Sequence, residues 1–294
     1  MKLRVILFSA LCFWVASCSN FPEPSPQNYE LFVGDSDSYP KFSPDGEWIA
    51  YYHFDAGSPK NPDYPTGLYI IDRNGQNRKL VLEGIHLNPA WSPDGQWLVF
   101  SSSGLIQKCK SNGDNLSSLK SMESGVYFFP DFYPDGNFLV FDRMVNVEGS
   151  FKKVNSDLLS EIQFFFPEIS TGRDPEFSPD GNFLTYMKGS REWPHFEIFS
   201  LELKSGKETR LTISNMDDKS PTWSPDGKKI AWSSNVQIHT MDADGKDQKP
   251  LVFGVYPSWS VKNEIVYSHA NADYTKEVLY IIGTDGKDRR QITY

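Results

Sequence analysis

The sequence predicts an all-β protein, a six-bladed β-propeller with four antiparallel strands per blade, from three observations. A short pattern, Pro-x-aromatic-Ser-Pro-Asp-Gly followed by aliphatic, small and aromatic residues, recurs along the chain. Repeats of about 40–50 residues with several strands each indicate propeller blades. No amphipathic stretch is long enough to predict a helix. The turn prolines are 49, 41, 45 and 46 residues apart, at Pro44, Pro93, Pro134, Pro179 and Pro225.

Each copy of the pattern predicts a β-hairpin, as the copy at 221–232 illustrates. Pro225 fixes the φ of a type I turn, Asp226 bonds its own backbone, and Gly227 takes the left-handed position. A single hairpin is marginally stable in water, so the copies must pack on one another. The other copies are 40–51, 89–100, 130–141 and 175–186, with a worn copy, one residue shorter, at 257–267.

Two further strands complete each blade in this prediction. Third strands are expected at 68–72, 196–201, 236–241 and 279–282, each followed by a glycine-containing turn. Short fourth strands follow, as at 78–82, 209–212 and 290–293. A proline lacks the N–H that a paired strand needs, and this costs nothing at a free edge. The first strand, which carries the proline, is therefore predicted to be the innermost.

The segment Leu31-Phe32-Val33 leaves the closure of the ring open. It precedes Pro44 by the same offset as Leu80 precedes Pro93, so it has the position of an outer strand. The last blade already has such a strand at 290–293. The segment either adds a fifth strand or competes for that place, and we expect an addition or a loose edge contact.

Residues 1–17 have the pattern of a cleaved signal peptide. Lys2 and Arg4 precede an apolar run that is shorter than the about 20 residues needed to span a bilayer. Val15-Ala16-Ser17-Cys18 resembles the bacterial lipoprotein box, which implies cleavage before Cys18 and its acylation with chains such as palmitate. Ser19, in place of the aspartate of the inner-membrane retention signal, favours the outer membrane. The alternative is an ordinary secretory signal with an incidental cysteine.

The remaining chain divides into a tether and one domain. Residues 18–27 contain the lipidated cysteine and a proline-rich stretch, and residues 28–294 are the predicted propeller. The formal net charge of −9 becomes about −11 once Lys2 and Arg4 are removed. An acidic chain lacks the basic footprint of a nucleic-acid-binding protein, so we expect no nucleic-acid partner.

Cysteine usage predicts no disulfide. Cys12 leaves with the signal peptide and Cys18 carries the lipid, so Cys109 has no partner within the chain. We expect Cys109 to be a small buried residue, since it lies in an apolar-alternating segment. We also expect the protein to be a monomer.

The repeat resembles that of the TolB-like propellers. The Ser-Pro-Asp-Gly hairpin followed by a strand and turn such as Leu68-Tyr69-Ile70-Ile71-Asp72-Arg73-Asn74-Gly75 carries this resemblance, which covers about nine tenths of the chain. It implies a bacterial envelope propeller that binds a protein or peptide. The amino-terminal α/β domain of that family has no counterpart in the pattern, and the family is soluble in the periplasm, so a role as the Tol–Pal component itself is not implied.

The variable connections point to a binding face. The two turns within each blade are short and share one face, whereas the other connections vary in sequence, and binding residues concentrate on such loops. The positions after the second strands carry no acidic residue, which suggests a mouth that accepts an anionic group, although solvated strand ends give the same pattern. The candidate binding residues are His53, Arg143, Lys188, Arg191, Trp193, His195, His269 and Tyr274.

Catalytic and metal signals are weak. His53 and His269 occupy equivalent positions and, with Asp55 or His86, could form a site like that of metal-dependent lyase propellers. The calcium-like stretches at 242–247 and 285–288 lack the twelfth-position glutamate and are interpreted as turns. No hydrolase elbow or zinc-protease motif is present.

The sequence therefore predicts a lipid-anchored, non-catalytic propeller of the bacterial envelope. We expect it to bind a protein or peptide and to need no cofactor or metal. Two alternatives stay open: a carbohydrate-binding or lyase-like propeller acting on acidic sugars, and an interaction scaffold without a small ligand.

Overall fold

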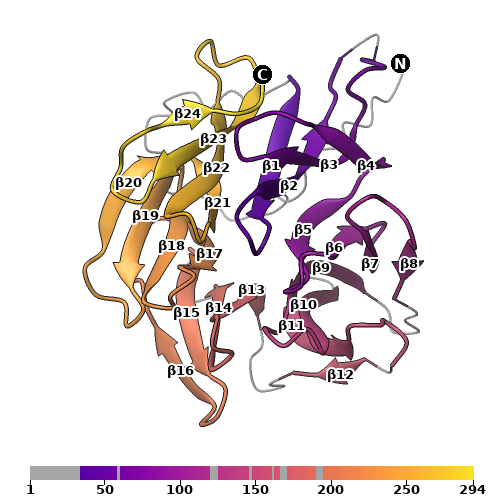
Figure 1. The fold of residues 1–294 in the computed structure, drawn as a ribbon. Coiled ribbons are helices and arrows are strands. Elements are labelled where there is room, and N and C mark those ends of the chain that lie inside the picture. The colour runs from indigo at the N-terminus through magenta and orange to yellow at the C-terminus, as the bar shows by residue number, and fades with distance from the viewer. Residues whose placement is uncertain are drawn as a thin grey trace, which may run out of the picture.

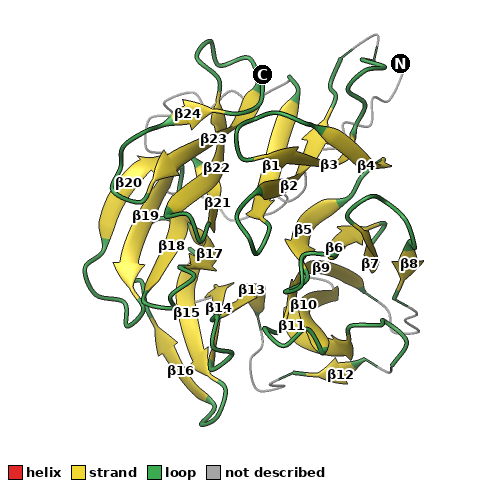
Figure 2. Cartoon of the chain, viewed as in Figure 1, coloured by secondary structure: helices red, strands yellow, loops and turns green. Residues whose placement is uncertain are grey.

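The described part of the chain consists of β-strands arranged as a ring of antiparallel sheets (Figures 1 and 2). The computed structural model describes residues 34–57, 60–119, 125–145, 148–160, 162–165, 171–189 and 195–294. In these ranges there is no helix long and apolar enough to cross a membrane. The predicted signal peptide, Cys18, the tether and the strand at 31–33 lie outside them. The all-β propeller class predicted from the sequence is confirmed.

Consecutive strands group into units of four that run outward from the first strand. The first unit contains β1 (Ser36–Phe42), β2 (Trp48–Phe54), β3 (Gly67–Asp72) and β4 (Lys79–Glu83). The second contains β5 (Leu87–Trp91), β6 (Trp97–Ser102), β7 (Leu105–Lys110) and β8 (Ser117–Ser118). The third contains β9 (Val126–Phe132), β10 (Phe138–Val145), β11 (Glu148–Asn155) and β12 (Gln163–Phe164).

The second half of the ring repeats this order. The fourth unit contains β13 (Gly172–Phe177), β14 (Phe183–Lys188), β15 (Glu197–Glu202) and β16 (Lys207–Arg210). The fifth contains β17 (Asp218–Trp223), β18 (Lys229–Ser234), β19 (Gln237–Asp242) and β20 (Lys249–Phe253). The sixth contains β21 (Val255–Trp259), β22 (Glu264–Ala270), β23 (Glu277–Gly283) and β24 (Arg290–Gln291).

The first and last units close the ring. A parallel bridge between Ser36 and Glu277 joins β1 to β23, and the Glu277 amide donates to the Asp35 carbonyl (3.1 Å). These two units therefore form one eight-stranded sheet, and the hydrogen bonding gives four four-stranded sheets and one larger sheet in place of six separate blades. Each first strand contacts the first strands of its two neighbours, including β21 and β1.

The Ser-Pro-Asp-Gly segments form the turns between first and second strands. Ser43 donates its hydroxyl proton to Asp45 (2.5 Å) and accepts the amide of Trp48 (2.9 Å), while Gly46 has a φ of 72°. The same serine contacts recur at Ser92, Ser178 and Ser224. In the worn copy Asn263 takes the left-handed position, with a φ of 60°. The turn predicted from local chemistry is therefore confirmed.

Both kinds of short turn lie on one face of the ring, which we call the turn face. In every unit, the backbone amide of the residue that follows the third strand donates to a backbone carbonyl in the turn between the first and second strands. The pairs are Arg73–Glu47, Ser111–Gln96, Ser156–Asn137, Leu203–Asn182, Ala243–Lys228 and Thr284–Asn263. The remaining connections lie on the opposite side, which we call the loop face.

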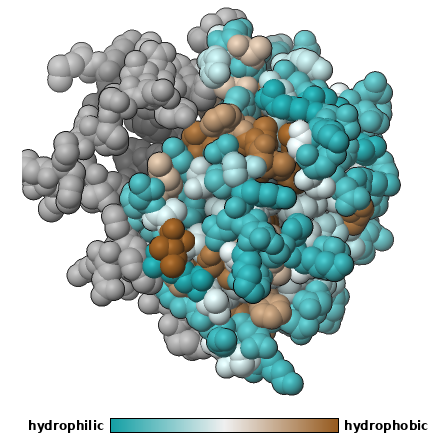
Figure 3. All heavy atoms as spheres, turned by 90° about the vertical axis from the view of Figure 1, so that its left-hand side faces the viewer, coloured by the Kyte–Doolittle hydropathy of each residue, from teal (hydrophilic) through white to brown (hydrophobic). Residues whose placement is uncertain are grey.

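The described hydrophobic core is divided into six clusters, each shared by two neighbouring units. Cys109 is fully buried in the cluster between the first and second units, as predicted, and burial raises the pKa of its thiol to about 12. The outer side of the ring that carries β16 and β20 is mostly hydrophilic, with separate hydrophobic patches (Figure 3). The apolar side chains are thus buried chiefly between units.

Candidate functional site

One irregularity recurs in the six first strands and shapes the inner surface of the ring. The residue before the strand proline has a positive φ, between 50° and 56°, and the pairing register shifts there. Such a shift is a β-bulge, which turns side chains away from the regular pleat. These residues are Tyr39, Asn88, Phe129, Asp174, Ser220 and Tyr256. Together with the prolines they line a central cavity of about 480 Å³, open solvent included.

The residues after the prolines form the next level of the channel, which we call the waist. They are Lys41, Ala90, Asp131, Glu176, Thr222 and Ser258. Three waist side chains accept backbone amides from another unit's first strand, which would otherwise lack a partner at the inner edge. These bonds are Phe42 to Ser258 (3.1 Å), Phe177 to Asp131 (3.0 Å) and Trp223 to Glu176 (2.8 Å). The waist therefore stabilises the contacts between units.

An ion pair crosses the channel at the waist. Nζ of Lys41, in the first unit, contacts Oε2 of Glu176 in the fourth unit, on the opposite side of the ring. Their side chains are 33% and 15% exposed, because protein surrounds them while they still face the channel space. Lys41 lines both the central cavity and a second cavity on the turn-face side. The ion pair therefore lies between these two spaces.

Three carboxylates interact electrostatically with the Lys41 ammonium. Burial acts to lower the pKa of Lys41, but Glu176, Asp131 and Asp174 outweigh it and raise the pKa. Burial raises the pKa of Asp131 to about 7, with Glu176 adding to the shift and Lys41 opposing it. Burial also raises the pKa of Asp174 to about 6. The inner ring thus places three carboxyl groups around one lysine, and two of them lose their protons only near neutral pH.

The second cavity, which we call the funnel, begins at the waist and reaches the first turns on the turn face. It encloses about 890 Å³ of empty space, open solvent included. Its walls carry one aromatic residue from each unit and the turn prolines. They are Phe42, Trp91, Phe132, Phe177, Trp223 and Trp259, with Pro44, Pro134, Pro179 and Pro225. A concave wall that joins apolar groups to a few polar groups is typical of a ligand site.

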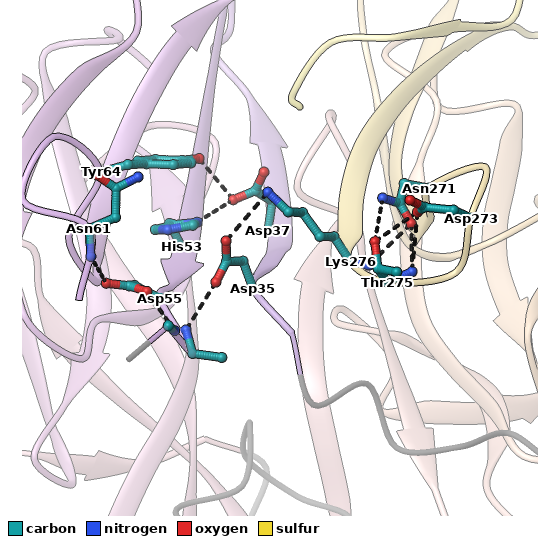
Figure 4. A network of polar contacts seen from close by, with 12 residues as sticks. Asp35, Asp37, His53, Asp55, Asn61, Tyr64, Asn271, Asp273, Thr275 and Lys276 are labelled. Atoms are coloured by element: carbon teal, nitrogen blue, oxygen red, sulfur yellow. Dashed lines mark hydrogen bonds and ion pairs between the residues drawn. The ribbon is translucent and has the colours of Figure 1, made fainter. Parts of the chain in front are cut away.

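His53 lies in a buried network between the first and last units rather than on an open mouth (Figure 4). It is 2% exposed, its Nδ1 lies 2.7 Å from Oδ1 of Asp37, and its ring stacks on Tyr64. The Tyr64 hydroxyl donates to the same oxygen (2.8 Å), and burial raises the pKa of Tyr64, so it remains a donor. The interface between these units therefore encloses His53, which the sequence reading placed at the loop-face mouth.

The other described candidates do not gather into one site. His269 is half-buried, its Nδ1 lies 2.7 Å from the Ala270 carbonyl, and burial lowers its pKa. Lys188 pairs with Glu208 (2.8 Å). His195 lies 3.9 Å from Asp217.

Tyr274 and Arg143 complete this set. Tyr274 is 71% exposed on the connection after β22, and Arg143 is a partly buried residue of β10. Arg191 and Trp193 lie outside the described residues.

The residues considered as possible metal ligands make other contacts. The Asp55 carboxylate accepts the amides of Gly57 (2.8 Å) and Asn61 (2.7 Å), and His86 Nε2 lies 3.1 Å from the Glu83 carbonyl. Among the residues that the structure describes, no three His, Cys, Asp or Glu side chains are grouped to hold a metal. The calcium-like stretches at 242–247 and 285–288 follow β19 and β23 as turns.

Sequence reasoning missed the waist residues. The signal was available in the aligned copies, because the position after the first proline is filled by residues of different charge and size within an otherwise uniform strand. The position before that proline varies in the same way. The positions after the second strands include His53 and His269, and neither residue lines the central cavity or the funnel.

Sequence comparisons give limited information. No family model matches the chain. The uncharacterized protein Atu1656 of Agrobacterium fabrum is 34% identical over 68 residues, which is 22% of this chain. The match spans 23% of that protein, less than a quarter of its length.

Solved structures with the same architecture are similar over most of the chain. A TolB-type protein of Agrobacterium tumefaciens matches with a TM-score of 0.66 and 22% identity, over 75% of this chain and 85% of that one. TolB of Acinetobacter baumannii matches with a TM-score of 0.66 and 21% identity, over 88% of this chain and 63% of that one. A chain of the nidogen/laminin complex matches with a TM-score of 0.61 and 11% identity, over 87% and 93%. The protein has a TolB-like β-propeller fold.

Proposed function

We propose that this protein is a lipid-anchored propeller of the bacterial envelope that binds a protein or peptide segment at the funnel, without catalysing a reaction. The observation that supports this proposal is the funnel itself. It combines four prolines and the partly exposed Trp91 and Trp259 with a charged waist below them, and four further aromatic residues of its lining are each less than 9% exposed. The TolB-like fold is compatible with this role, but a fold alone does not assign a function.

The wall of the funnel suits a peptide better than a small polar molecule. Aromatic side chains supply large contact areas and dominate binding hot spots. Trp91 and Trp259 are partly exposed, and Val261 at the rim is 52% exposed. A ligand that enters from the turn face would bury these side chains before it reached Lys41. The proposed binding surface therefore lies on the side opposite the loop face, which the variation in sequence favours.

Membrane attachment is the second part of the proposal. The lipoprotein-like box at Cys18 supports acylation, and the segment up to residue 34 has about sixteen residues, which reach at most about 55 Å when extended. The first unit is therefore the part of the ring nearest to the anchor along the chain. Replacing Cys18→Ala should move the protein from the membrane to the soluble fraction of the envelope. Retention on the membrane would contradict the anchor.

Capture of envelope partners tests the funnel. Val261→Arg places a long cation at the funnel rim, and Ile213→Arg makes the same change at a side chain that is 81% exposed and not among the funnel residues. We expect the partners retained by the wild-type and Ile213→Arg proteins to be lost with Val261→Arg. Equal retention by all three proteins would contradict the funnel as the binding surface.

The loop face is the alternative surface. Tyr274→Ala removes its most exposed described aromatic candidate, and loss of partners with this variant alone would move the binding surface there. An effect of neither Val261→Arg nor Tyr274→Ala would favour a scaffold that uses another surface. Retention of acidic oligosaccharides in place of proteins would favour the carbohydrate-binding alternative.

A further inference from the structure

We infer that the funnel recognises a cationic group of its peptide ligand, a lysine or arginine side chain or a free N-terminus, at the carboxylate of Asp131. This inference rests on the proposed function and adds the chemistry of the ligand. It is carried by three features of the described residues: the unused capacity of Asp131, the charge balance of the waist, and the shape and composition of the funnel wall.

Asp131 has remaining hydrogen-bonding capacity at a cavity surface. Its Oδ2 accepts the Phe177 amide (3.0 Å), and the residue lines both the central cavity and the funnel. A carboxylate can accept about four hydrogen bonds. Among the described ion pairs, Lys41 contacts Glu176 and Arg173 contacts Asp142, and neither cation contacts Asp131. A cationic donor in the funnel would therefore find an acceptor.

Glu176 differs from Asp131 because most of its hydrogen-bonding capacity is used. Its Oε2 contacts Lys41, and its Oε1 accepts the Thr222 hydroxyl (2.8 Å) and the Trp223 amide (2.8 Å). The waist thus contains a more engaged carboxylate, which has three donors, and a less engaged one. The engaged carboxylate holds the ion pair across the channel, which leaves Asp131 for the ligand.

The charge balance selects a cation. Asp131, Asp174 and Glu176 surround Lys41, so the inner ring carries three carboxylates and one ammonium. Arg173, the next cation, is engaged by the buried carboxylate of Asp142 (3.3 Å). An incoming ammonium or guanidinium would reduce the excess of negative charge, whereas an anionic ligand would increase it. Opposite charges attract more strongly in a partly desolvated site than in water.

The wall of the funnel suits the stem of a lysine or arginine. The apolar methylene groups of these side chains pack along aromatic surfaces while the charged group reaches a polar site. The partly exposed Trp91 and Trp259 and the turn prolines present apolar surface along the funnel, whereas the other four aromatic residues of its lining are each less than 9% exposed. The apolar part of the wall and the carboxylate of Asp131 thus provide one surface for the stem of the side chain and one for its charged group.

Selection of random heptapeptides displayed on phage tests this inference with the full chain in detergent. Asp131→Asn keeps the shape of the side chain and an oxygen for the Phe177 amide but removes the charge. Asp135→Asn is the matched control, because Asp135 is an exposed carboxylate on the turn of the same unit. We expect the wild-type protein to enrich peptides with a lysine, an arginine or a required free N-terminus. Their affinity should fall about tenfold or more with Asp131→Asn and stay unchanged with Asp135→Asn.

Two results would overturn the inference. Enrichment of peptides without a cationic group, or equal affinity for wild-type and Asp131→Asn proteins, would remove Asp131 from recognition while leaving peptide binding at the funnel intact. A lack of any peptide that binds the wild-type protein and fails to bind Val261→Arg would contradict the proposed function and the inference together. Urea unfolding of Asp131→Asn checks that the variant is folded, because only a folded variant that fails to bind has lost recognition of the peptide.

Discussion

Two polar clusters of the first unit, one beside the last unit and one that reaches across the ring, differ in how far their polar groups are satisfied. At the junction with the last unit, Asp37 is 3% exposed and accepts hydrogen bonds from both His53 and Tyr64. At the waist, Lys41 crosses to Glu176 beside Asp131, and these side chains line cavities. The first cluster is enclosed, whereas the second faces open space.

This difference in surroundings gives the first cluster a structural role and allows the second cluster to bind a ligand. A buried carboxylate with donors on the protein holds elements together, and its loss leaves those donors without partners. A carboxylate at a cavity with unused capacity raises the free energy of the unbound protein and can be compensated by a ligand. The sequence places aspartates in both clusters, and only the surroundings distinguish their roles. Four substitutions test this distinction.

Asp37→Ala should have the largest effect on stability. It leaves the His53 Nδ1 and the Tyr64 hydroxyl without their shared acceptor in a buried interface. We expect the free energy of unfolding to fall by about 3 kcal/mol, as for other broken buried pairs. Urea denaturation followed by circular dichroism measures this loss. Asp273→Ala, an exposed aspartate of the neighbouring loop, should cost less than about 0.5 kcal/mol, and equal losses would contradict the comparison.

Lys41→Met should destabilise the protein less, and in a pH-dependent way. It removes the cation shared by Glu176, Asp131 and Asp174 while keeping an apolar stem in the channel. We expect a loss of about 2 kcal/mol at pH 8 and a smaller loss at pH 5, where Asp131 and Asp174, whose pKa values burial raises to about 7 and about 6, take up protons. Urea denaturation at the two pH values provides the measurement. Lys228→Met, which changes an exposed lysine on a turn, serves as the control. A stability loss from Lys41→Met that is the same at both pH values would contradict an electrostatic role for Lys41 at the waist.

Asp131→Asn should stabilise the unbound protein at high pH. The pKa of Asp131 is raised from 3.8 to about 7, with Lys41 and Glu176 as the charged neighbours. Between these values the folded state binds more protons than the unfolded state, so this carboxylate lowers stability as the pH rises through that window. We expect the asparagine variant to gain about 1 kcal/mol over wild type at pH 8 and little at pH 4, after allowance for partial exposure. A destabilised variant at pH 8 would assign Asp131 a purely structural role.

Tyr274→Ala should have the smallest effect. The side chain is 71% exposed on the loop face, and we expect a change of less than about 0.5 kcal/mol in the free energy of unfolding. Peptide binding at the funnel should be unchanged, as measured by fluorescence titration with a peptide selected on the wild-type protein. Weakened binding would show that the loop face takes part in recognition.

The fold could be predicted because its signals are local. The Ser-Pro-Asp-Gly turn depends on contacts within five residues, such as those of Ser43 with Asp45 and Trp48, and repetition reveals the ring. The waist depends on contacts between units, such as the pair of Lys41 and Glu176, which are 135 positions apart. The surroundings of His53 depend on Tyr64, because the long connection between β2 and β3 places the Tyr64 ring against the imidazole ring of His53. The register shift before each proline also determines which side chains face the channel.

The seam between the first and last units has a mechanical consequence. A chain held at its amino-terminal end would transmit tension to β1, whose parallel contact with β23 is a single bridge at Ser36, and the Ser268 hydroxyl donates to the Asp37 carbonyl (3.0 Å) across the same seam. Pulling would load that bridge before the longer antiparallel ladders of the other units. The force needed to open the ring would therefore be set by one interface, and single-molecule stretching from residue 34 should show the seam separating first.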